Sequence, residues 1–246
     1  NPMNIRFIVQ YDGTRYKGWQ KQVRTTETIQ GKLEQAITKV VGETVQVLGA
    51  GRTDAGVHSM GQIANVRLTG NVIVSDWEKQ VNDALPSDIV IISSQEVSNN
   101  FHSRFNAKAK TYVYRMRIGS QKDVFHRRFI WQYGQVLDIE KMKEAATLLI
   151  GTHDFKGFTS NKKSKMSTVR TISAIQIEKA KDILTFSVTG DGFLTNMVRI
   201  IVGTLVEVGE GKKQTDSIMQ VLKSKERFYA GFTAPPEGLT LKKVYY

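Results

Sequence analysis

A carboxylate and a guanidinium lie two residues apart in a glycine-rich loop of this 246-residue sequence. The loop carries four glycines between residues 49 and 61, with Arg52 and Asp54 near its centre. Glycine at this density indicates unusual backbone angles or the close approach of another molecule. If the two side chains meet, the arginine lowers the pKa of Asp54 and keeps it ionised. An ionised, positioned aspartate can act as a covalent nucleophile or as a general base.

The same loop has two other interpretations. In the first, Asp54 caps a turn and Arg52 contacts the surface. In the second, the loop cradles a phosphate, because Gly49 and Gly51 match the start of a dinucleotide-binding fingerprint. The second is disfavoured, because the sixth position of the fingerprint is Asp54, whose charge would repel a pyrophosphate, and no Gly-Lys-Ser/Thr follows.

The charge balance of the chain favours a polyanionic partner. The sequence has 35 Lys and Arg against 23 Asp and Glu, a net charge of +12, which points to nucleic acid more often than to a membrane surface. Residues 101–128 hold eight Lys or Arg and one acid, interleaved with aromatic residues, and residues 156–170 hold five and no acid. We interpret residues 160–167 as a mobile loop that could become ordered on RNA. A solvated basic surface is the alternative.

Composition excludes several classes of protein. Cysteine is absent, which excludes disulfide scaffolds, thiolate zinc sites and thiol nucleophiles. The four histidines lack the spacing of a helical metal-binding pair, so we expect no metal site. No apolar stretch approaches the 18 residues of a membrane span, and the first residues do not resemble a secretory signal. We therefore expect a cytoplasmic protein that contacts no membrane.

Hydrophobic periodicity predicts the same order of elements, β-α-β-β-α-β, in both halves of the chain. In the first half the predicted strands and helices cover residues 5–11, 29–41, 44–48, 62–68, 75–85 (with Ser75 as N-cap) and 88–97. In the second half they cover residues 112–118, 139–150, 171–178, 184–189, 194–208 and 239–246, with a further short helix at 215–222.

This order predicts an α+β protein made of two ferredoxin-like subdomains, a fold common among RNA-binding domains. Residues 1–100 would form the first subdomain and carry the glycine-rich loop, and residues 101–246 would form the second. We expect their antiparallel sheets to flank a central basic cleft.

Motifs throughout the chain resemble those of the tRNA pseudouridine synthase A family. The most specific is GRTDAGVH at residues 51–58, followed by Gly61 and Gln62. Other matching blocks lie at residues 11–14, 16–20, 101–105, 108–114, 151–155, 197–203 and 234–239. Together they span nearly the whole chain in the order typical of the family.

The resemblance implies an isomerase that converts uridine to pseudouridine at positions 38, 39 and 40 of the tRNA anticodon arm. It also implies a homodimer that grips one tRNA across both subunits and uses no metal or organic cofactor. Asp54 would be the nucleophile, which adds to C6 of uracil, attacks the ribose anomeric carbon or assists a route through a glycal. The freed base must rotate without escaping, so confinement matters in every route.

Three other residues receive roles from the resemblance. Tyr112 matches a tyrosine that packs against the target base and could relay a proton from C5. Arg199, just outside the apolar stripe of its helix, resembles an arginine that pairs with the catalytic aspartate. Arg52 would contact phosphate or occupy the place of the flipped nucleotide, offsetting part of the cost of unstacking. We interpret three histidines as structural or backbone-facing groups: His58, His102 and His153.

Two rival functions remain open at this point. A non-catalytic RNA-binding module built from the same two subdomains would explain the charge and the aromatic residues, but it leaves the loop around Asp54 without a role. A phosphate-using enzyme is the second rival, and the failed glycine fingerprints disfavour it.

Overall fold

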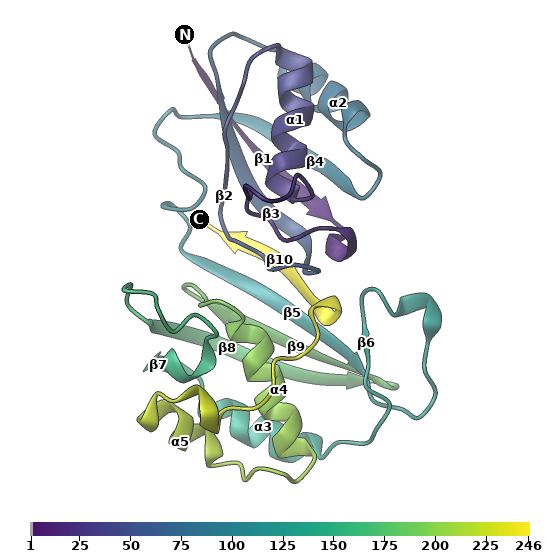
Figure 1. Ribbon diagram of the computed structural model, residues 1–246, viewed down its shortest axis with the longest axis vertical. Coiled ribbons are helices and arrows are strands. Elements are labelled where there is room, and N and C mark those ends of the chain that lie inside the picture. The colour runs from purple at the N-terminus through teal and green to yellow at the C-terminus, as the bar shows by residue number, and fades with distance from the viewer. Residues whose placement is uncertain (1) are drawn as a thin grey trace. The chain divides into compact units, whose positions relative to one another are not determined.

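The computed structural model describes residues 2–246, and the chain divides into two compact units (Figure 1). Unit 1 comprises Asn1–Lys108 together with Thr240–Tyr246, and unit 2 comprises Ala109–Leu239. Each unit combines β-strands with helices, so the α+β class predicted from the sequence is confirmed.

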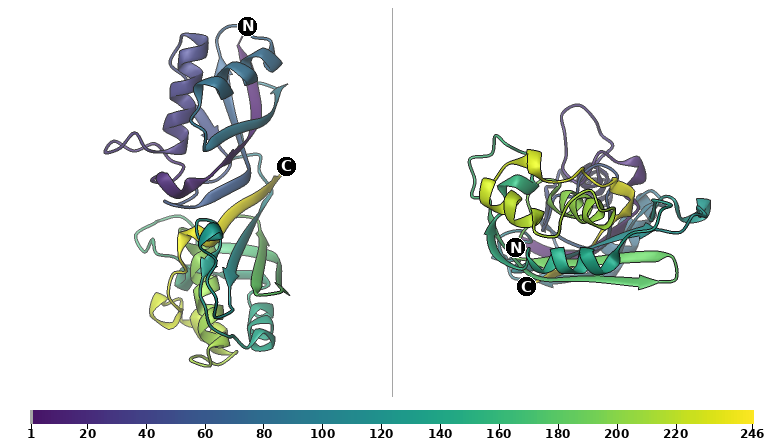
Figure 2. Two further views of the ribbon diagram at one scale, coloured as in Figure 1. Left: turned by 90° about the vertical axis from the view of Figure 1, so that its right-hand side faces the viewer. Right: turned by 90° about the horizontal axis from the view of Figure 1, so that it is seen from below.

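Unit 1 contains a sheet with two helices that pack against each other. Its elements are β1 (Met3–Tyr11), α1 (Ile29–Val41), β2 (Val47–Gly49), β3 (His58–Leu68), α2 (Val74–Ala84), β4 (Ile89–Val97) and β10 (Leu239–Tyr245). Strand β1 lies between β4 and β3 and is antiparallel to both. Strands β2 and β10 each pair with β3, β2 antiparallel and β10 parallel. Figure 2 shows α1 and α2 on the same side of these strands.

The periodic spacing of apolar residues in the strands and helices explains how this unit forms its core. Alternate residues of β1, among them Ile5 and Phe7, are buried in one hydrophobic cluster with the apolar stripe of α1. Helix α1 begins where the Thr28 side chain accepts a hydrogen bond from the N–H of Gly31. It ends at Gly42, whose φ of +78° is the left-handed conformation common at helix ends.

Three boundaries in unit 1 differ clearly from the predictions. Strand β3 begins at His58 and not at residue 62. Helix α2 begins at Val74 and has no side-chain N-cap, so Ser75 lies inside its first turn and the predicted cap is wrong. The strand predicted at residues 44–48 is only β2, because pairing with β3 starts at Val47, opposite Val66. For β2, pairing with β3 and not the local residue preference sets the boundary.

Unit 2 is organised around four antiparallel strands in the order β5-β9-β8-β7. Its elements are β5 (Ala109–Arg117), β6 (Trp131–Gln132), α3 (Ile139–Thr147), β7 (Gly151–Asp154), β8 (Val169–Ala180), β9 (Ile183–Gly190), α4 (Met197–Gly209) and α5 (Ser217–Ser224). Strand β6 pairs parallel with β5. Helix α4 is buried along most of its length and packs against α3.

Periodicity did not predict β6 and β7, because both are too short to show alternation. Each of them is a strand because it pairs with a longer neighbour. Trp131 lies opposite Met116 of β5, and Gly151 lies opposite Ile172 of β8. The predicted turn between β8 and β9 is present, with Lys181 in the left-handed conformation at φ +56°.

The last strand belongs to unit 1, whereas residues 239–246 are predicted from the sequence to lie in the second half. Strand β10 pairs with the start of β3, and the Tyr246 hydroxyl donates to the carbonyl oxygen of Ser103 at 2.6 Å. The two compact units divide after Lys108, whereas the sequence analysis placed a boundary after residue 100. A strand's local pattern predicts which face is buried but not which strand it joins.

Gly61 gives β10 room to approach β3, because a Cβ atom there would lie 2.3 Å from the carbonyl oxygen of Lys242. We expect Gly61→Ala to lower the free energy of unfolding by about 1–3 kcal/mol through this clash, measured by thermal denaturation. Gly70→Ala is the matched control, because a Cβ atom there meets nothing within 4 Å. Equal melting temperatures for the two variants would contradict this account.

Candidate active site

Asp54 lies at the start of a tight turn in the connection from β2 to β3. The N–H of Val57 donates to the carbonyl oxygen of Asp54 at 3.0 Å, which closes the turn. Gly56 occupies its third position with φ +82°, where glycine is favoured. The Asp54 side chain is half-buried, so the turn presents the carboxylate at the surface of unit 1.

A second segment, residues 11–19, holds this loop by its backbone. The N–H of Trp19 donates to the carbonyl oxygen of Thr53 at 3.0 Å. On the other side of the aspartate, the N–H of Gly56 donates to the carbonyl oxygen of Tyr16 at 3.3 Å. The chain is therefore tied to the same segment on both sides of the carboxylate.

Two glycines of this segment allow the close approach. A Cβ atom on Gly18, whose φ is +94°, would lie 2.8 Å from the carbonyl oxygen of Thr53. A Cβ atom on Gly13 would lie 1.9 Å from the carbonyl oxygen of Val57. Any larger residue at either position would push the loop away.

Side chains reinforce the same contact from inside the unit. The Tyr11 hydroxyl, at the end of β1, lies 2.7 Å from the Thr53 hydroxyl, and both groups are buried. The Gln62 side-chain amide donates to the carbonyl oxygen of Gly51 at 2.7 Å. We call residues 11–19 and their contacts with residues 50–58 the loop clamp.

His58 belongs to the loop clamp and is not presented to solvent. Its ring is buried, and Nδ1 accepts a hydrogen bond from the N–H of Gly13 at 2.9 Å, with Asp12 Oδ1 at 3.4 Å. An accepting Nδ1 carries no proton, so the proton is on Nε2. His102 and His153 also bond to backbone groups. The structural role predicted for the three histidines is confirmed.

Tyr16 anchors the loop clamp to the start of β4. Its hydroxyl donates to Asp88 Oδ1 at 2.5 Å, and the backbone N–H of Asp12 donates to the carbonyl oxygen of Asp88 at 3.0 Å. Burial, and then the bond to Asp88, raises the pKa of Tyr16. The hydroxyl therefore stays protonated and remains a donor at neutral pH.

The loop clamp is the part of the site that sequence reasoning missed. Residues 11–20 carry a family resemblance but no assigned role in the sequence analysis. Their glycines and aromatic residues were the available signal, because that combination is typical of close backbone contact. The contact itself depends on the pairing of β1 with β3, which no local pattern reveals.

The structure does not bring Arg52 and Asp54 together. Arg52 is exposed, and within residues 2–246 its guanidinium forms no ion pair or hydrogen bond. The intervening Thr53 side chain is buried against Tyr11, whereas Arg52 is exposed and Asp54 is half-buried. The condition for Arg52 to lower the pKa of Asp54, contact between the side chains, is therefore not met.

Tyr112 lies in unit 2, on β5 opposite Val188 of β9. Its ring is 7% exposed and packs edge-on against Phe193, with centroids 5.3 Å apart and an interplanar angle of 89°. Tyr114 is fully buried two residues along, and its hydroxyl donates to the carbonyl oxygen of Pro235 at 2.7 Å. Both tyrosines are buried as predicted, but Val113 between them is buried as well, so the alternation holds only from Tyr114 onward.

Arg199 also lies in unit 2, in the first turn of α4 and at the margin of its buried surface, as the helical spacing predicted. Its Nε donates to the carbonyl oxygen of Ala234 at 2.7 Å, and Nη1 donates to Asn196 Oδ1 at 3.0 Å. The N–H of Ala234 returns a bond to the carbonyl oxygen of Arg199 at 3.0 Å. Two neutral acceptors thus orient the guanidinium within the unit.

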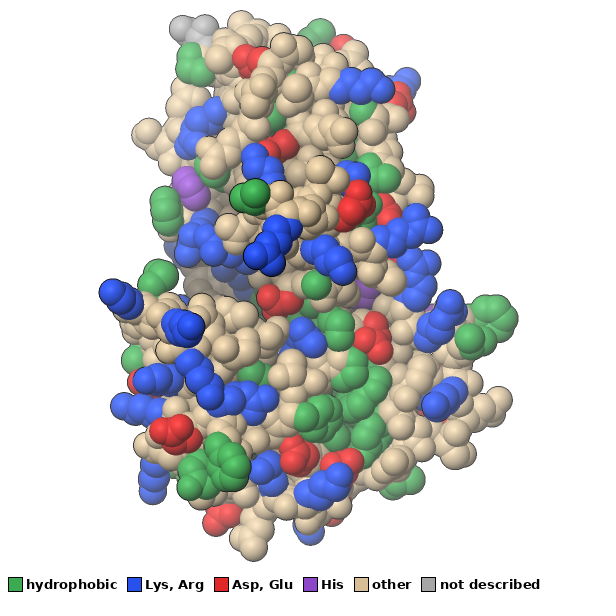
Figure 3. Space-filling model, viewed as in Figure 1, with side chains coloured by type: hydrophobic (Ala, Val, Ile, Leu, Met, Phe, Trp, Pro, Cys, Tyr) green, Lys and Arg blue, Asp and Glu red, His purple; other side chains and the backbone are tan. Residues whose placement is uncertain are grey.

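The basic loop predicted at residues 160–167 lies between β7 and β8. Lys162, Lys163 and Lys165 are exposed there, and none of them forms an ion pair with any residue the structure describes. Figure 3 shows many other Lys and Arg side chains on the face in view. Positive charge without an acidic partner attracts phosphate.

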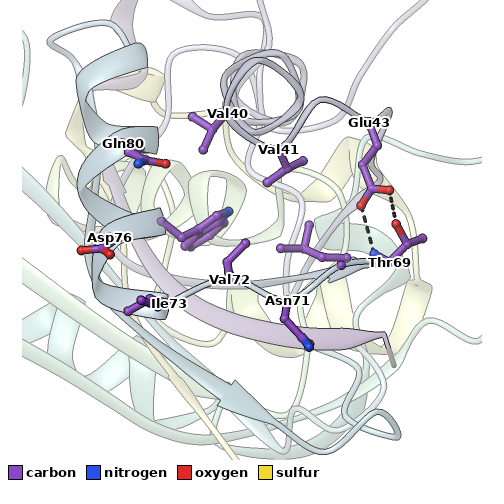
Figure 4. Close-up of a pocket in the computed structure, with 12 residues that line it drawn as sticks. Val40, Val41, Glu43, Thr69, Asn71, Val72, Ile73, Asp76 and Gln80 are labelled. Atoms are coloured by element: carbon purple, nitrogen blue, oxygen red, sulfur yellow. Dashed lines mark hydrogen bonds between the residues drawn. The ribbon is translucent and has the colours of Figure 1, made fainter.

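A pocket in unit 1 lies apart from the loop clamp (Figure 4). Its lining comes from the end of α1, residues 68–73 and the start of α2. Glu43 accepts hydrogen bonds there from the backbone and the hydroxyl of Thr69, which lower the pKa of Glu43. No residue of the glycine-rich loop contributes, so we do not include this pocket in the site.

Neither a metal centre nor a bilayer-spanning helix is found in the part of the chain that the structure describes. No cluster of three or more His, Asp or Glu residues among residues 2–246 is arranged to hold a metal ion. No helix in that range has both the length and the apolar character to cross a membrane.

Comparison with known proteins gives a consistent family. The family model described as tRNA pseudouridine synthase matches residues 7–106 and 145–246. A tRNA pseudouridine synthase A of Thermoanaerobacter sp. (strain X514) is 44% identical over 243 residues, which is 99% of each chain. A tRNA pseudouridine synthase A of Acetivibrio thermocellus is 45% identical over 243 residues, with the same coverage.

Among solved structures, the archaeal box H/ACA sRNP Nop10-Cbf5 complex matches 95% of this chain and 59% of that chain at 10% identity. The TM-score is 0.38, which is too low to support an inference about the fold.

The bond between Tyr11 and Thr53 ties β1 directly to the loop. We expect Tyr11→Phe to lower the free energy of unfolding by about 1–3 kcal/mol, because the Thr53 hydroxyl stays buried and loses this partner. Denaturant unfolding measures the change. Tyr11→Phe combined with Thr53→Val is the control, and it should cost clearly less than the sum of the single variants. Strict additivity would mean that the bond contributes nothing.

Proposed function

Because the chain belongs to the tRNA pseudouridine synthase family and is an isomerase that acts on tRNA, we propose that Asp54 is its nucleophile. The observation that carries this proposal is the loop clamp. Asp54 is the one acid among residues 49–61, and the chain on both sides of it is hydrogen-bonded in place. A reacting group must be held in a defined position, because small displacements cost large factors in rate.

The reaction balances without any added group. The bond between ribose C1′ and uracil N1 breaks, the base rotates and a bond forms between C1′ and C5. C5 then loses its proton and N1 gains one, so the product is an isomer of the substrate. In each of the three routes the Asp54 carboxylate acts close to the glycosidic bond, as a nucleophile toward C6 or C1′ or as the base that opens the glycal route. We assign no route among them.

Three further residues serve the substrate in this proposal. Tyr112 stacks on the target uracil and relays the proton from C5, which its rigid packing against Phe193 supports. Arg199 pairs with the catalytic carboxylate. The hydrogen bonds that already orient its guanidinium support this role. Arg52 contacts RNA phosphate or replaces the flipped nucleotide in the stem, which its exposure and unpaired charge support.

The finer features of fold and substrate are part of the same proposal. The order β4-β1-β3-β2 in unit 1 supports a ferredoxin-like subdomain, and β5-β9-β8 supports a related one in unit 2. The family resemblance supports positions 38, 39 and 40 of the anticodon arm as targets, a homodimer as the working form and the cytoplasm as its location. The basic cleft stays a prediction.

The alternative is a non-catalytic module that binds RNA through the same charge and aromatic residues. Such a module does not explain the loop clamp, because binding RNA does not require a carboxylate in a fixed position. The two functions differ in what happens when Asp54 loses its charge.

We expect Asp54→Asn to reduce tritium release from tRNA transcripts carrying 5-tritiated uridine by on the order of 10⁴-fold or more. Affinity for tRNA should not fall, because removing a negative charge does not weaken attraction to phosphate. Asp76→Asn on α2 is the control and should release tritium like the wild type. Full turnover by Asp54→Asn would refute its assignment, and binding without release by the wild type would favour the non-catalytic module.

We expect Tyr112→Phe to lower kcat by about 10²- to 10⁴-fold with little change in KM, because stacking is retained and the proton relay is lost. Single-turnover and steady-state tritium release separate the two parameters. Tyr114→Phe is the matched control, because its hydroxyl bonds only the carbonyl oxygen of Pro235 and should affect stability alone. Equal kcat values for Tyr112→Phe and the wild type would exclude the relay.

A further inference from the structure

Residues 101–107, which we call the aromatic hook, display a phenylalanine to solvent on unit 1. Phe105 is 77% exposed, and its ring is stacked on His102, with centroids 4.1 Å apart and 24° between the planes. His102 Nδ1 accepts hydrogen bonds from the N–H groups of Arg104 at 3.1 Å and Phe105 at 3.3 Å. The ring pair is therefore preformed, and the function proposed above gives it no role.

A buried polar network holds the aromatic hook on the sheet. The N–H and the hydroxyl of Ser103 both donate to Asn65 Oδ1 on β3, at 2.9 and 2.6 Å. The Asn65 amide donates to Asn4 Oδ1 on β1 at 2.9 Å, and the Asn4 amide donates to the carbonyl oxygens of Ser98 and Phe101, each at 2.9 Å. All three polar side chains are fully buried, and such a satisfied network favours a single backbone conformation.

The other side of the aromatic hook is fixed as well. The Tyr246 hydroxyl donates to the carbonyl oxygen of Ser103, and burial raises the pKa of Tyr246, so this donor keeps its proton. The Asn106 side chain accepts from the N–H of His102 at 2.7 Å. The fixed backbone thus prevents Phe105 from reaching the core, although leaving the ring in water forgoes hydrophobic stabilisation.

The surroundings of the ring pair are positive. Arg104 and Lys108 are exposed, and Arg67 donates only to the neutral carbonyl oxygens of Asn99 and Phe101. Within residues 2–246, none of these three cations forms an ion pair.

The same environment keeps the aromatic face itself uncharged. Burial, followed by the charges of Arg67 and Arg104, lowers the pKa of His102, so the stacked pair is neutral at pH 7. A neutral aromatic surface bordered by cations matches a nucleotide, whose base stacks on a ring while its phosphate meets the charges. A second copy of this surface would be repelled by the like charges.

We propose that the aromatic hook binds an unpaired nucleotide of the tRNA, with the base stacked on Phe105 and its phosphate against Arg104. This inference rests on the proposed tRNA substrate and adds a contact beyond the target uridine. Asn65, under the hook, is seven residues along β3 from His58, where the loop clamp ends, or roughly 23 Å at the rise of an extended strand. Because the hook is held near one end of β3 and the loop clamp near the other, we assign the hook a nucleotide other than the one that reacts.

Binding of an unmodified tRNA transcript to the full chain tests the proposal. Phe105→Ala should weaken binding by about 5- to 100-fold, the loss expected from one stacked base. Phe105→Trp keeps a stacking surface and should bind as tightly as the wild type. Phe105 is exposed, so its replacement leaves folding intact. Phe228→Ala in unit 2 is the matched control, because Phe228 is 85% exposed but lies edge-on to Tyr229 in a short helical turn.

Salt dependence separates the base contact from the phosphate contact. Phe105→Ala should leave the slope of log K against log salt unchanged, whereas Arg104→Gln should reduce its magnitude by about one. Both results together support the proposal. Wild-type affinity in Phe105→Ala, or equal losses in Phe105→Ala and Phe228→Ala, would overturn it.

Two further measurements separate nucleotide binding from self-association and from a role in catalysis. Sedimentation of Phe105→Ala that reveals a changed oligomeric state with unchanged tRNA affinity would overturn the proposal in favour of self-association. Tritium release at saturating tRNA should be the same in Phe105→Ala and the wild type, because the hook does not touch the reacting uridine. A wild-type protein that binds no tRNA would refute the proposed function and this inference together, whereas failure of Phe105→Ala alone refutes only the inference.

Discussion

Thr53 is the residue on which the position of the candidate nucleophile depends. Its carbonyl oxygen accepts from the N–H of Trp19 and its hydroxyl bonds the hydroxyl of Tyr11, so backbone and side chain are both tied to the N-terminal segment. The Thr53 side chain is buried, whereas Arg52 is exposed and Asp54 is half-buried. The buried threonine thus fixes the backbone from which the Asp54 carboxylate projects. A flexible loop would catalyse the reaction less well, because catalysis depends on reacting groups that are held in position before the substrate binds.

Strand β3 links this constraint to the rest of unit 1. At one end His58 closes the loop clamp on Gly13, and toward the other end Asn65 carries the polar network under the aromatic hook. Both ends use buried polar groups whose hydrogen bonds are satisfied, which restrict the backbone more sharply than apolar packing does. A single rigid strand therefore sets the spacing between the candidate nucleophile and the surface that we propose binds a second nucleotide. Such fixed spacing strengthens the binding of a long RNA, because once one contact has formed the second forms within the same complex.

Much of the chain could be predicted from local patterns. The alternation in β1 and the helical stripes of α1 and α4 reflect the periods of strand and helix, which act over a few residues. The glycine-rich loop was recognisable for the same reason, since glycine density marks unusual backbone wherever it occurs. The short strands β6 and β7 and the partner of β10 were not predictable, because they depend on residues far away in the sequence.

By itself the sequence determined the class of the protein, its family, its positive charge and the identity of the candidate nucleophile, because residue types and short motifs carry that information. Only the tertiary structure decided that Arg52 faces solvent, that residues 11–19 clamp the loop and that the C-terminal strand completes the first unit. Each of these depends on contacts between segments separated by tens of residues. Such contacts are chosen by the burial and pairing of whole elements, to which any one local pattern contributes only a part.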